Sequence, residues 1–454
     1  MVELFAALPD GPVPPLAADY VDRVLTHARR SARRRRLGAA AAWTAIVAAV
    51  CTFLIPGVLP EPAPAAPGQR AALPDRFAGY STLTSTAERA APGRAIALYG
   101  YGSDALFTMF QQLVVGADAD TYRRVGAWDG RGRAPGLLSP DGTWVLLGRA
   151  AGPAPELLLV DLTTGRERSV PLGAWLEVRL LAWSPDGRYV AYSAAPDGPA
   201  YGGESTVGYD VLQRGTLRLL DVTTGRSTEF PSMGRPSAAA FAPDSARMAV
   251  QEGERVHLLR LNGAEDRVVS VGAGRGLAPR AGWSPDGRLL ATVPWDGPAP
   301  AAGKVEFLAV GADAVAPAPV GDVARVLGWR DAGHLVVATA PGGHGLELAE
   351  VTLAAGDRRV LSRFDPGMTC EFGMQHCDVL DLQLATGLLA GLTVRAAGSP
   401  DRGPWPWPLR LLVAALAAAG LVVLYGFADR LRVRAAVRSF DGRRPGGGAV
   451  LGPY

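Results

Sequence analysis

Lysine and histidine are scarce in this chain of 454 residues, although both commonly carry chemistry. Lysine occurs once, at Lys304, and we attribute the excess of arginine to GC-rich codon usage. Histidine occurs five times, and the sequence contains no HExxH, GxSxG or GxxxxGK[ST] pattern. Zinc peptidases, serine hydrolases and P-loop nucleotidases are therefore not indicated. We expect no enzyme activity and no cofactor, although a site assembled from loops of several repeats would escape this search.

Cysteine is also rare, with three residues in the whole chain. Cys51 lies in an apolar run, where we expect it to be inert. Cys370 and Cys377 flank the sequence EFGMQH. Their close spacing, in a region that we expect outside the cell, favours a disulfide. The alternative is a soft-metal site for Cu(I), with the ligands Met368, Cys370, Met374, His376 and Cys377.

The net charge is small, at +3, and its distribution argues against a nucleic-acid partner. Residues 1–37 carry +3 and residues 428–454 carry +4, which leaves −4 for residues 38–427. A protein that neutralises phosphates needs a basic surface on its folded domain. Here the basic charge is confined to two short flanks.

Two long uncharged apolar runs lie near the ends of the chain, at residues 37–59 and 411–428. Each is within the length range of a membrane-spanning helix. Arg33–Arg36 precede the first run and four arginines follow the second, so the positive-inside rule predicts that both termini are cytoplasmic. The alternative for the first run is a cleaved signal peptide, with Ala63–Ala65 as a small-residue cleavage site.

These observations predict a two-pass protein of the cell membrane whose central region is extracytoplasmic. The expected parts are an Arg-rich tail at 1–36, a spanning helix at 37–59, a Pro- and Ala-rich linker at 60–76, a folded domain at 77–396, a linker at 397–410, a second spanning helix at 411–428 and a basic tail at 429–454. The N-terminal tail sets the topology in our interpretation, and an amphipathic helix lying on anionic lipid is the alternative.

The domain at 77–396 contains an internal repeat. Its aspartates recur at Asp141, Asp186, Asp244, Asp286 and Asp331, with steps of 45, 58, 42 and 45 residues. A period near 45 residues is the size of a four-stranded propeller blade. The most regular turns are Ser139, Pro140, Asp141 and Gly142; Ser184, Pro185, Asp186 and Gly187; and Ser284, Pro285, Asp286 and Gly287.

Each repeat predicts four strands joined by turns of known chemistry. An SPDG sequence favours a type I turn, because Pro presets φ and Gly tolerates the closing position. A TTGR sequence at 163–166 and 223–226 predicts the turn before the fourth strand. The strands themselves follow from short apolar runs that alternate with period two.

The SPDG and TTGR turns, at this period, resemble the WD40-like repeats of TolB and related bacterial proteins. The resemblance covers about residues 77–396 and implies an all-β propeller that is used mostly for binding. We expect six to seven four-stranded blades and favour seven, with the last incomplete. Residues 378–396 are expected to pair with N-terminal sequence and close the ring, which leaves no open edge.

The repeated aromatic residues and the longest insertion complete the prediction. Trp183, Phe241, Trp283 and Trp329 precede the turns, and we favour a core role over ligand contact. The insertion at 194–215 is the candidate recognition loop. The predicted function is non-catalytic binding or scaffolding of a protein or small ligand at the cell envelope, with lipid contacted by the two helices. A transmembrane sensor is the alternative, and a hydrolase is less favoured.

Overall fold

The computed structural model describes residues 71–79, 81, 83–102, 111–126, 136–148, 153–196, 214–296, 299–311, 313–340, 345–364, 378–405 and 407–441. The chain divides into two compact units, one of residues 64–405 and one of residues 1–63 with 406–454. The first expected spanning segment, the pair Cys370 and Cys377 with its alternative metal ligands, and most of the insertion at 194–215 lie outside the described residues.

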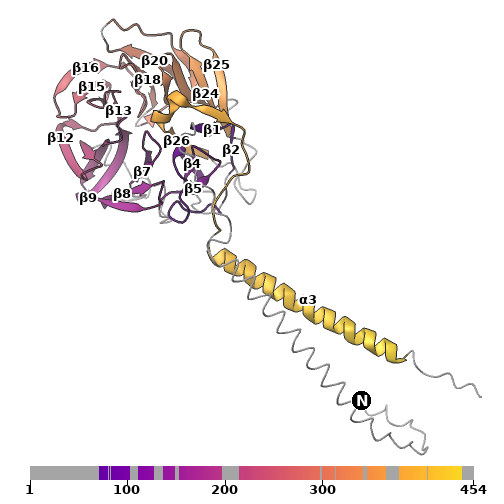
Figure 1. The fold of residues 1–454 in the computed structure, drawn as a ribbon. Coiled ribbons are helices and arrows are strands. Elements are labelled where there is room, and N and C mark those ends of the chain that lie inside the picture. The colour runs from indigo at the N-terminus through magenta and orange to yellow at the C-terminus, as the bar shows by residue number, and fades with distance from the viewer. Residues whose placement is uncertain are drawn as a thin grey trace, which may run out of the picture. The chain divides into compact units, whose positions relative to one another are not determined.

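The unit of residues 64–405 is an all-β, propeller-like array of four-stranded antiparallel sheets around a central axis (Figure 1). Two blades share one long strand, and their strands are β6 (Gly136–Leu138), β7 (Trp144–Leu147), β8 (Ala154–Asp161), β9 (Glu167–Trp183), β10 (Tyr189–Pro196), β11 (Thr216–Asp221) and β12 (Arg226–Gly234). The first half of β9 pairs with β8 and its second half with β10, so this strand ends one blade and begins the next.

Three further blades follow in chain order. The first is β13 (Ala238–Phe241), β14 (Arg247–Glu252), β15 (Arg255–Arg260) and β16 (Glu265–Ser270). The second is β17 (Arg275–Leu277), β18 (Leu289–Asp296), β20 (Gly303–Ala309) and β21 (Val320–Val323), with β19 (Ala299–Pro300) paired to β18. The third is β22 (Arg325–Asp331), β23 (His334–Thr339), β24 (Leu346–Thr352) and β25 (Arg358–Phe364).

Burial falls from the first strand of a blade to its last. All four residues of β13 are buried, whereas five of the six residues of β16 are exposed. The first strand packs on both faces because neighbouring blades cover it, which requires small and apolar side chains. The aromatic residues Trp183, Phe241, Trp283 and Trp329 are buried as well, as the predicted core role requires, although Trp183 also lines the cavity described below. Trp329 also donates its Nε1 hydrogen to the Ala281 carbonyl at 2.9 Å.

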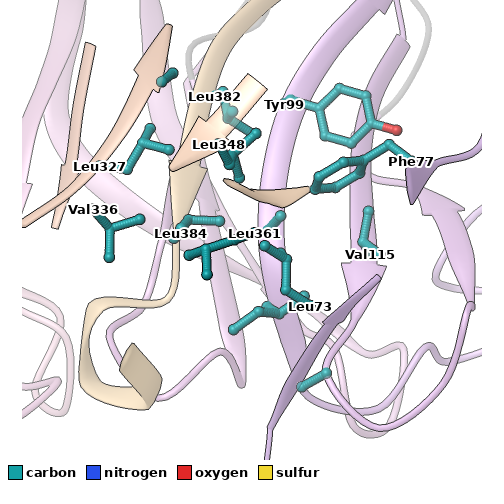
Figure 2. Packing of buried hydrophobic residues seen from close by; sticks show 14 of the residues in the cluster. Leu73, Phe77, Tyr99, Val115, Leu327, Val336, Leu348, Leu361, Leu382 and Leu384 are labelled. Carbon is teal, nitrogen blue, oxygen red and sulfur yellow. The ribbon is translucent and has the colours of Figure 1, made fainter. Parts of the chain in front are cut away.

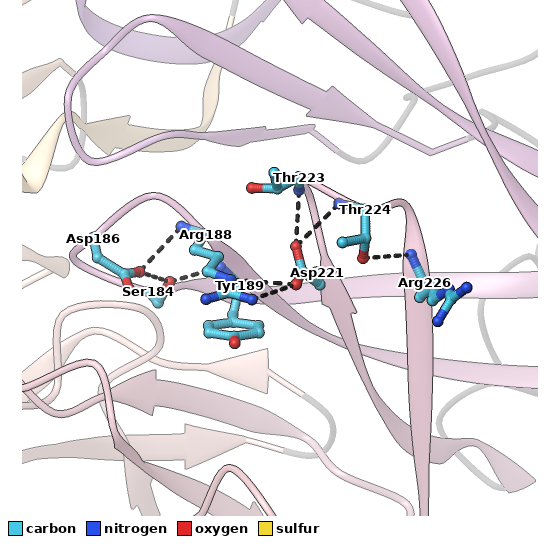
Figure 3. A network of polar contacts seen from close by, with 8 residues as sticks. All are labelled: Ser184, Asp186, Arg188, Tyr189, Asp221, Thr223, Thr224 and Arg226. Carbon is cyan, nitrogen blue, oxygen red and sulfur yellow. Dashed lines mark hydrogen bonds and ion pairs between the residues drawn. The ribbon is translucent and has the colours of Figure 1, made fainter.

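The repeated turn sequences form hydrogen-bonded turns in the structure. In the turn after β9, the Gly187 amide donates to the Ser184 carbonyl at 2.9 Å, and Gly187 has φ +74°. The Ser184 hydroxyl donates to Asp186 and accepts from the Tyr189 amide (Figure 3). In the later turn of the same blade, the Asp221 carboxylate accepts from two threonine amides and from Arg188. One ion pair therefore joins the two turns of this blade.

The ring closes through its C-terminal strand. Strand β26 (Asp378–Leu384) pairs antiparallel with β3 (Ala95–Gly102), and β4 (Gln111–Gly116) and β5 (Tyr122–Arg124) complete that blade. The expected pairing of residues 378–396 with N-terminal sequence is confirmed. The described strands form six four-stranded units. The favoured seventh, incomplete blade is not among them, because β26 supplies the missing first strand of the N-terminal blade.

The first and last blades meet in a continuous apolar seam (Figure 2). Strand β1 (Ala72–Pro74) pairs in parallel with β27 (Thr393–Arg395), and β2 (Arg76–Phe77) pairs in parallel with β25. The ring of Phe77 stacks on Phe364 with centroids 4.1 Å apart and meets Tyr99 edge-on at 5.7 Å. The 3-10 helix η4 (Thr386–Gly391) follows β26 and contributes the buried Leu389.

The propeller unit extends into both segments that were expected to be linkers. Strand β1 lies within residues 60–76, and Asp401 lies within residues 397–410. The Arg123 side chain is buried and donates to the Asp401 carboxylate at 2.8 Å and to the Asp401 carbonyl at 2.7 Å. These segments are fixed because the closing blade supplies hydrogen-bond partners for both of them.

The other unit contains one described helix, α3 (Trp407–Asp441). Its segment Leu409–Ala428 has a mean hydropathy of 2.4. The described residues contain one helix that is long and apolar enough to cross a bilayer, and it is this one. The helix begins before the expected span at 411–428 and continues through Asp441.

Replacing Phe77 by alanine tests the seam. Because Phe77 is buried and stacks on Phe364, we expect Phe77→Ala to lower the free energy of unfolding by about 3 to 5 kcal/mol. Urea denaturation of the full chain in detergent measures this change. The control is Val360→Ala on the neighbouring strand β25, at a side chain 43% exposed, for which we expect a change within about 0.5 kcal/mol. Equal effects of the two variants would contradict the packing of the seam.

Candidate functional site

A cavity of ≈ 260 Å³ lies on the propeller axis. Five blades contribute residues of their first strand to the lining of this cavity, and the blade of β17 contributes Pro279, Arg280 and Ala281, which follow that strand. Representative lining residues from the six blades are Leu137, Leu181, Ala238, Arg280, Arg325 and Asp381. A site at the axis is thus built by residues from the whole ring.

The charged residues of the cavity lining are three arginines and one aspartate, namely Arg179, Arg280, Arg325 and Asp381. Asp381 is the centre of the group. Arg280 binds its two carboxylate oxygens through two nitrogens, at 2.8 and 3.2 Å. Arg325 donates to the first of these oxygens at 3.0 Å. The carboxylate therefore joins three blades across the axis.

Both partners of the ion pair between Arg280 and Asp381 have a left-handed backbone conformation. Arg280 has φ +67° and Asp381 has φ +46°, although neither residue is glycine. The pairing of β26 with β3 also shifts register between Leu380 and Gln383, which places Asp381 in a bulge. Bulges re-aim side chains, and left-handed backbone at residues other than glycine persists only where the surroundings hold it. Here both features turn the carboxylate toward the arginines.

Gln383 extends the polar network to the next blade. Its Nε2 donates to the Gly136 carbonyl at 2.8 Å and to Asp381 at 3.2 Å, and its Oε1 accepts from the Leu138 amide at 3.2 Å. This buried amide satisfies backbone groups of β6 that have no strand neighbour on the axis side. The closing strand β26 therefore carries two polar residues of the site.

The cluster lies deep in the protein and still faces open space. The Asp381 side chain has protein around it in nearly every direction, yet 42% of its surface is exposed to the cavity. Burial alone would raise the pKa of Asp381, but the Arg280 and Arg325 guanidinium groups outweigh burial and lower this pKa below its ordinary value. Burial, followed by the like charge of Arg280, lowers the pKa of Arg179 to about 10.

These groups are suited to holding an anion. The pKa of Asp381 is lowered from its ordinary acidic value and that of Arg179 is about 10, so both side chains are charged at neutral pH. A general acid or base works best with a pKa near the working pH, which neither Asp381 nor Arg179 has. Guanidinium groups bind carboxylate and phosphate oxygens in a fork geometry, as Arg280 already does with Asp381.

The turn residues singled out by sequence lie mainly elsewhere. Of the three SPDG sequences, only Pro140 is among the residues that line the cavity. Two neighbouring aspartates of the N-terminal blade, Asp118 and Asp120, pair with Arg94 at 3.0 Å and with Arg395 at 2.9 Å. Over the described ranges, no group of three or more His, Cys, Asp or Glu side chains could hold a metal ion.

The sequence does carry a signal for the arginines. Arg179 stands four residues before Trp183, Arg280 three before Trp283, and Arg325 four before Trp329. The corresponding position before Phe241 is Ser237, which also lines the cavity. A polar residue three or four positions before the aromatic residue is thus shared by these four repeats. Asp381 has no such signal, because it comes from the closing strand.

No family model matches the chain, and no curated protein matches it. Solved structures resemble it weakly. A TolB from Acinetobacter baumannii is 17% identical, with a TM-score of 0.43 over 64% of this chain and 67% of that one. A putative TolB from Agrobacterium tumefaciens is 15% identical, with a TM-score of 0.37 over 60% and 90%. A periplasmic gluconolactonase from Pseudomonas aeruginosa is 16% identical, with a TM-score of 0.38 over 61% and 84%. The propeller-like fold therefore rests on this chain's own strand pairing.

The variant Asp381→Asn tests whether the carboxylate holds the cluster. Asparagine tolerates left-handed backbone but loses the charge. We expect a loss of about 2 kcal/mol in unfolding free energy at neutral pH, because hydrogen bonds to charged groups contribute about this much. The Asp381 contribution is fully present above the unfolded aspartate pKa of about 3.9 and is lost as the pH falls through the lower folded pKa. The gap between variant and wild type should therefore close in acid.

Denaturation curves at a series of pH values measure that gap. The matched control is Asp322→Asn, at an exposed aspartate with φ +49°. A gap that is independent of pH, or equal for the two variants, would show that the Asp381 charge does not stabilise the site.

Proposed function

We propose that this protein is a non-catalytic binding protein of the cell envelope, whose propeller holds a ligand at the axial cavity. The arginine-lined cavity is the observation that carries this proposal. Its charged groups are already hydrogen-bonded in fixed positions, so they can receive a ligand without rearranging. Asp381 and Arg179 do not titrate near neutral pH, which favours binding over acid–base chemistry by these two groups.

Attachment to the membrane is the second part of the proposal. The apolar segment Leu409–Ala428 of α3 supports it, together with the uncharged run at 37–59 and the arginines that flank both runs. On this proposal both termini are cytoplasmic and the propeller is outside. β1 and β27 pair beside each other, so the chain would leave the propeller toward both spans from one place on the ring.

Protease treatment of intact cells tests this topology. We expect added protease to digest the propeller while a tag after Tyr454 stays protected until the membrane is permeabilised. The reason is that arginine-rich segments resist transfer across the membrane. A propeller that is protected in intact cells, with or without a digested tag, would contradict the proposed orientation.

Photocrosslinking tests binding at the cavity. A photoreactive residue placed at Ala301, which lines the cavity, should give a discrete adduct in intact cells. The same residue at Val268, 42% exposed on the last strand of its blade, is the control and should not give that adduct. Equal labelling at both positions, or none at Ala301, would contradict a ligand at the axis.

A further inference from the structure

Arginine predominates over aspartate among the described charged residues that line the axial cavity. Arg280 and Arg325 both bind the single carboxylate of Asp381, and Arg179 lines the same cavity. Guanidinium groups that share a partly enclosed space repel one another, because the low dielectric strengthens the repulsion. Burial is the main cause of the lowered pKa of Arg179, and the like charge of Arg280 adds to it.

Donor capacity remains after the internal contacts are made. Each guanidinium group has five N–H donors. Toward the cavity's own aspartate, Arg280 uses two nitrogens and Arg325 uses one. The Asp381 carboxylate is 42% exposed toward the open space, so a second anion can approach the arginines from the cavity side.

The size of the cavity limits what can enter. A volume of ≈ 260 Å³ lies just below the usual range for pockets that hold drug-sized ligands. Apolar side chains of Leu181, Ala238 and Leu327 line the cavity beside the charged group. A short carbon chain with one or two charged ends fits this combination.

We propose that the cavity binds a small organic carboxylate, with Arg280 and Arg325 as the direct ligands of its oxygens and Arg179 as a nearby positive charge. A carboxylate is the group that these arginines already hold at Asp381, with Arg280 bound through two nitrogens. Phosphate can pair in the same geometry and is therefore the competitor in the test. This inference rests on the proposed function and names the ligand class of the same site.

Asp381 then has a second role as an internal competitor. When no other anion is bound, the negative charge of Asp381 reduces the repulsion between the arginines. The same charge repels an incoming anion. Removing its charge should tighten carboxylate binding, although the same change weakens the unliganded fold. A purely structural ion pair would show the loss of stability without the gain in binding.

The test is a titration of the purified full chain, in nanodiscs of uncharged lipid, with succinate at constant ionic strength set by chloride. Isothermal calorimetry and the shift in thermal unfolding both report binding. We expect saturable binding to the wild type and tighter binding to Asp381→Asn. Arg325→Gln should weaken binding at least about tenfold, since it removes a hydrogen bond from a charged donor. Arg363→Gln, which breaks the exposed pair with Glu347 away from the cavity, should match the wild type.

Each result decides the inference. No binding of succinate by the wild type, or equal binding by the Arg325 and Arg363 variants, would overturn the site. Phosphate binding as tight as succinate would overturn the choice of a carboxylate. If Arg325→Gln does not fold, the sign of the change in Asp381→Asn still decides, because weaker or unchanged binding there contradicts the internal competitor. Adduct formation at Ala301 without succinate binding would leave the proposed function standing and reject this inference alone.

Discussion

The pairing of β26 with β3 is the constraint on which the rest of the structure depends. A row of blades that stays open exposes unpaired backbone groups at each end, which favours association with other chains. In this chain a strand more than 250 residues away supplies the first strand of the N-terminal blade. The parallel pairs at β1 and β2 and the stacking of Phe77 on Phe364 reinforce the same joint. Closure thus combines backbone pairing with apolar packing.

The strand that closes the ring also supplies two polar residues of the candidate site. The strand that completes the ring carries Asp381 and Gln383, and both side chains bind groups of other blades. Without β26 the arginines of the neighbouring blades would face one another with no carboxylate between them. The bulge and the left-handed backbone at Asp381 are therefore maintained by the ring that they help to close.

Local chemistry made much of the fold predictable. SPDG and TTGR sequences determine turns through neighbouring residues, so their period indicated the blades, and the aromatic residues before four of the five repeated turns are buried as expected. The number of blades was harder, because residues 378–384 look the same in sequence whether they begin a new blade or complete the first. Only long-range pairing distinguishes the two. The site was missed for the same reason: Arg179 and Asp381 are 202 residues apart, and no short motif contains both.

A disulfide engineered across the closing strands tests whether β26 closes the ring. A Cβ atom at Gly100 would lie 3.6 Å from the Cβ of Leu380, a separation that a disulfide can bridge. With the three native cysteines replaced by serine, we expect Gly100→Cys with Leu380→Cys to form an internal crosslink on mild oxidation. Gly100→Cys with Val268→Cys should not. A folded protein in which the first pair stays reduced would contradict a ring closed by its C-terminal strand.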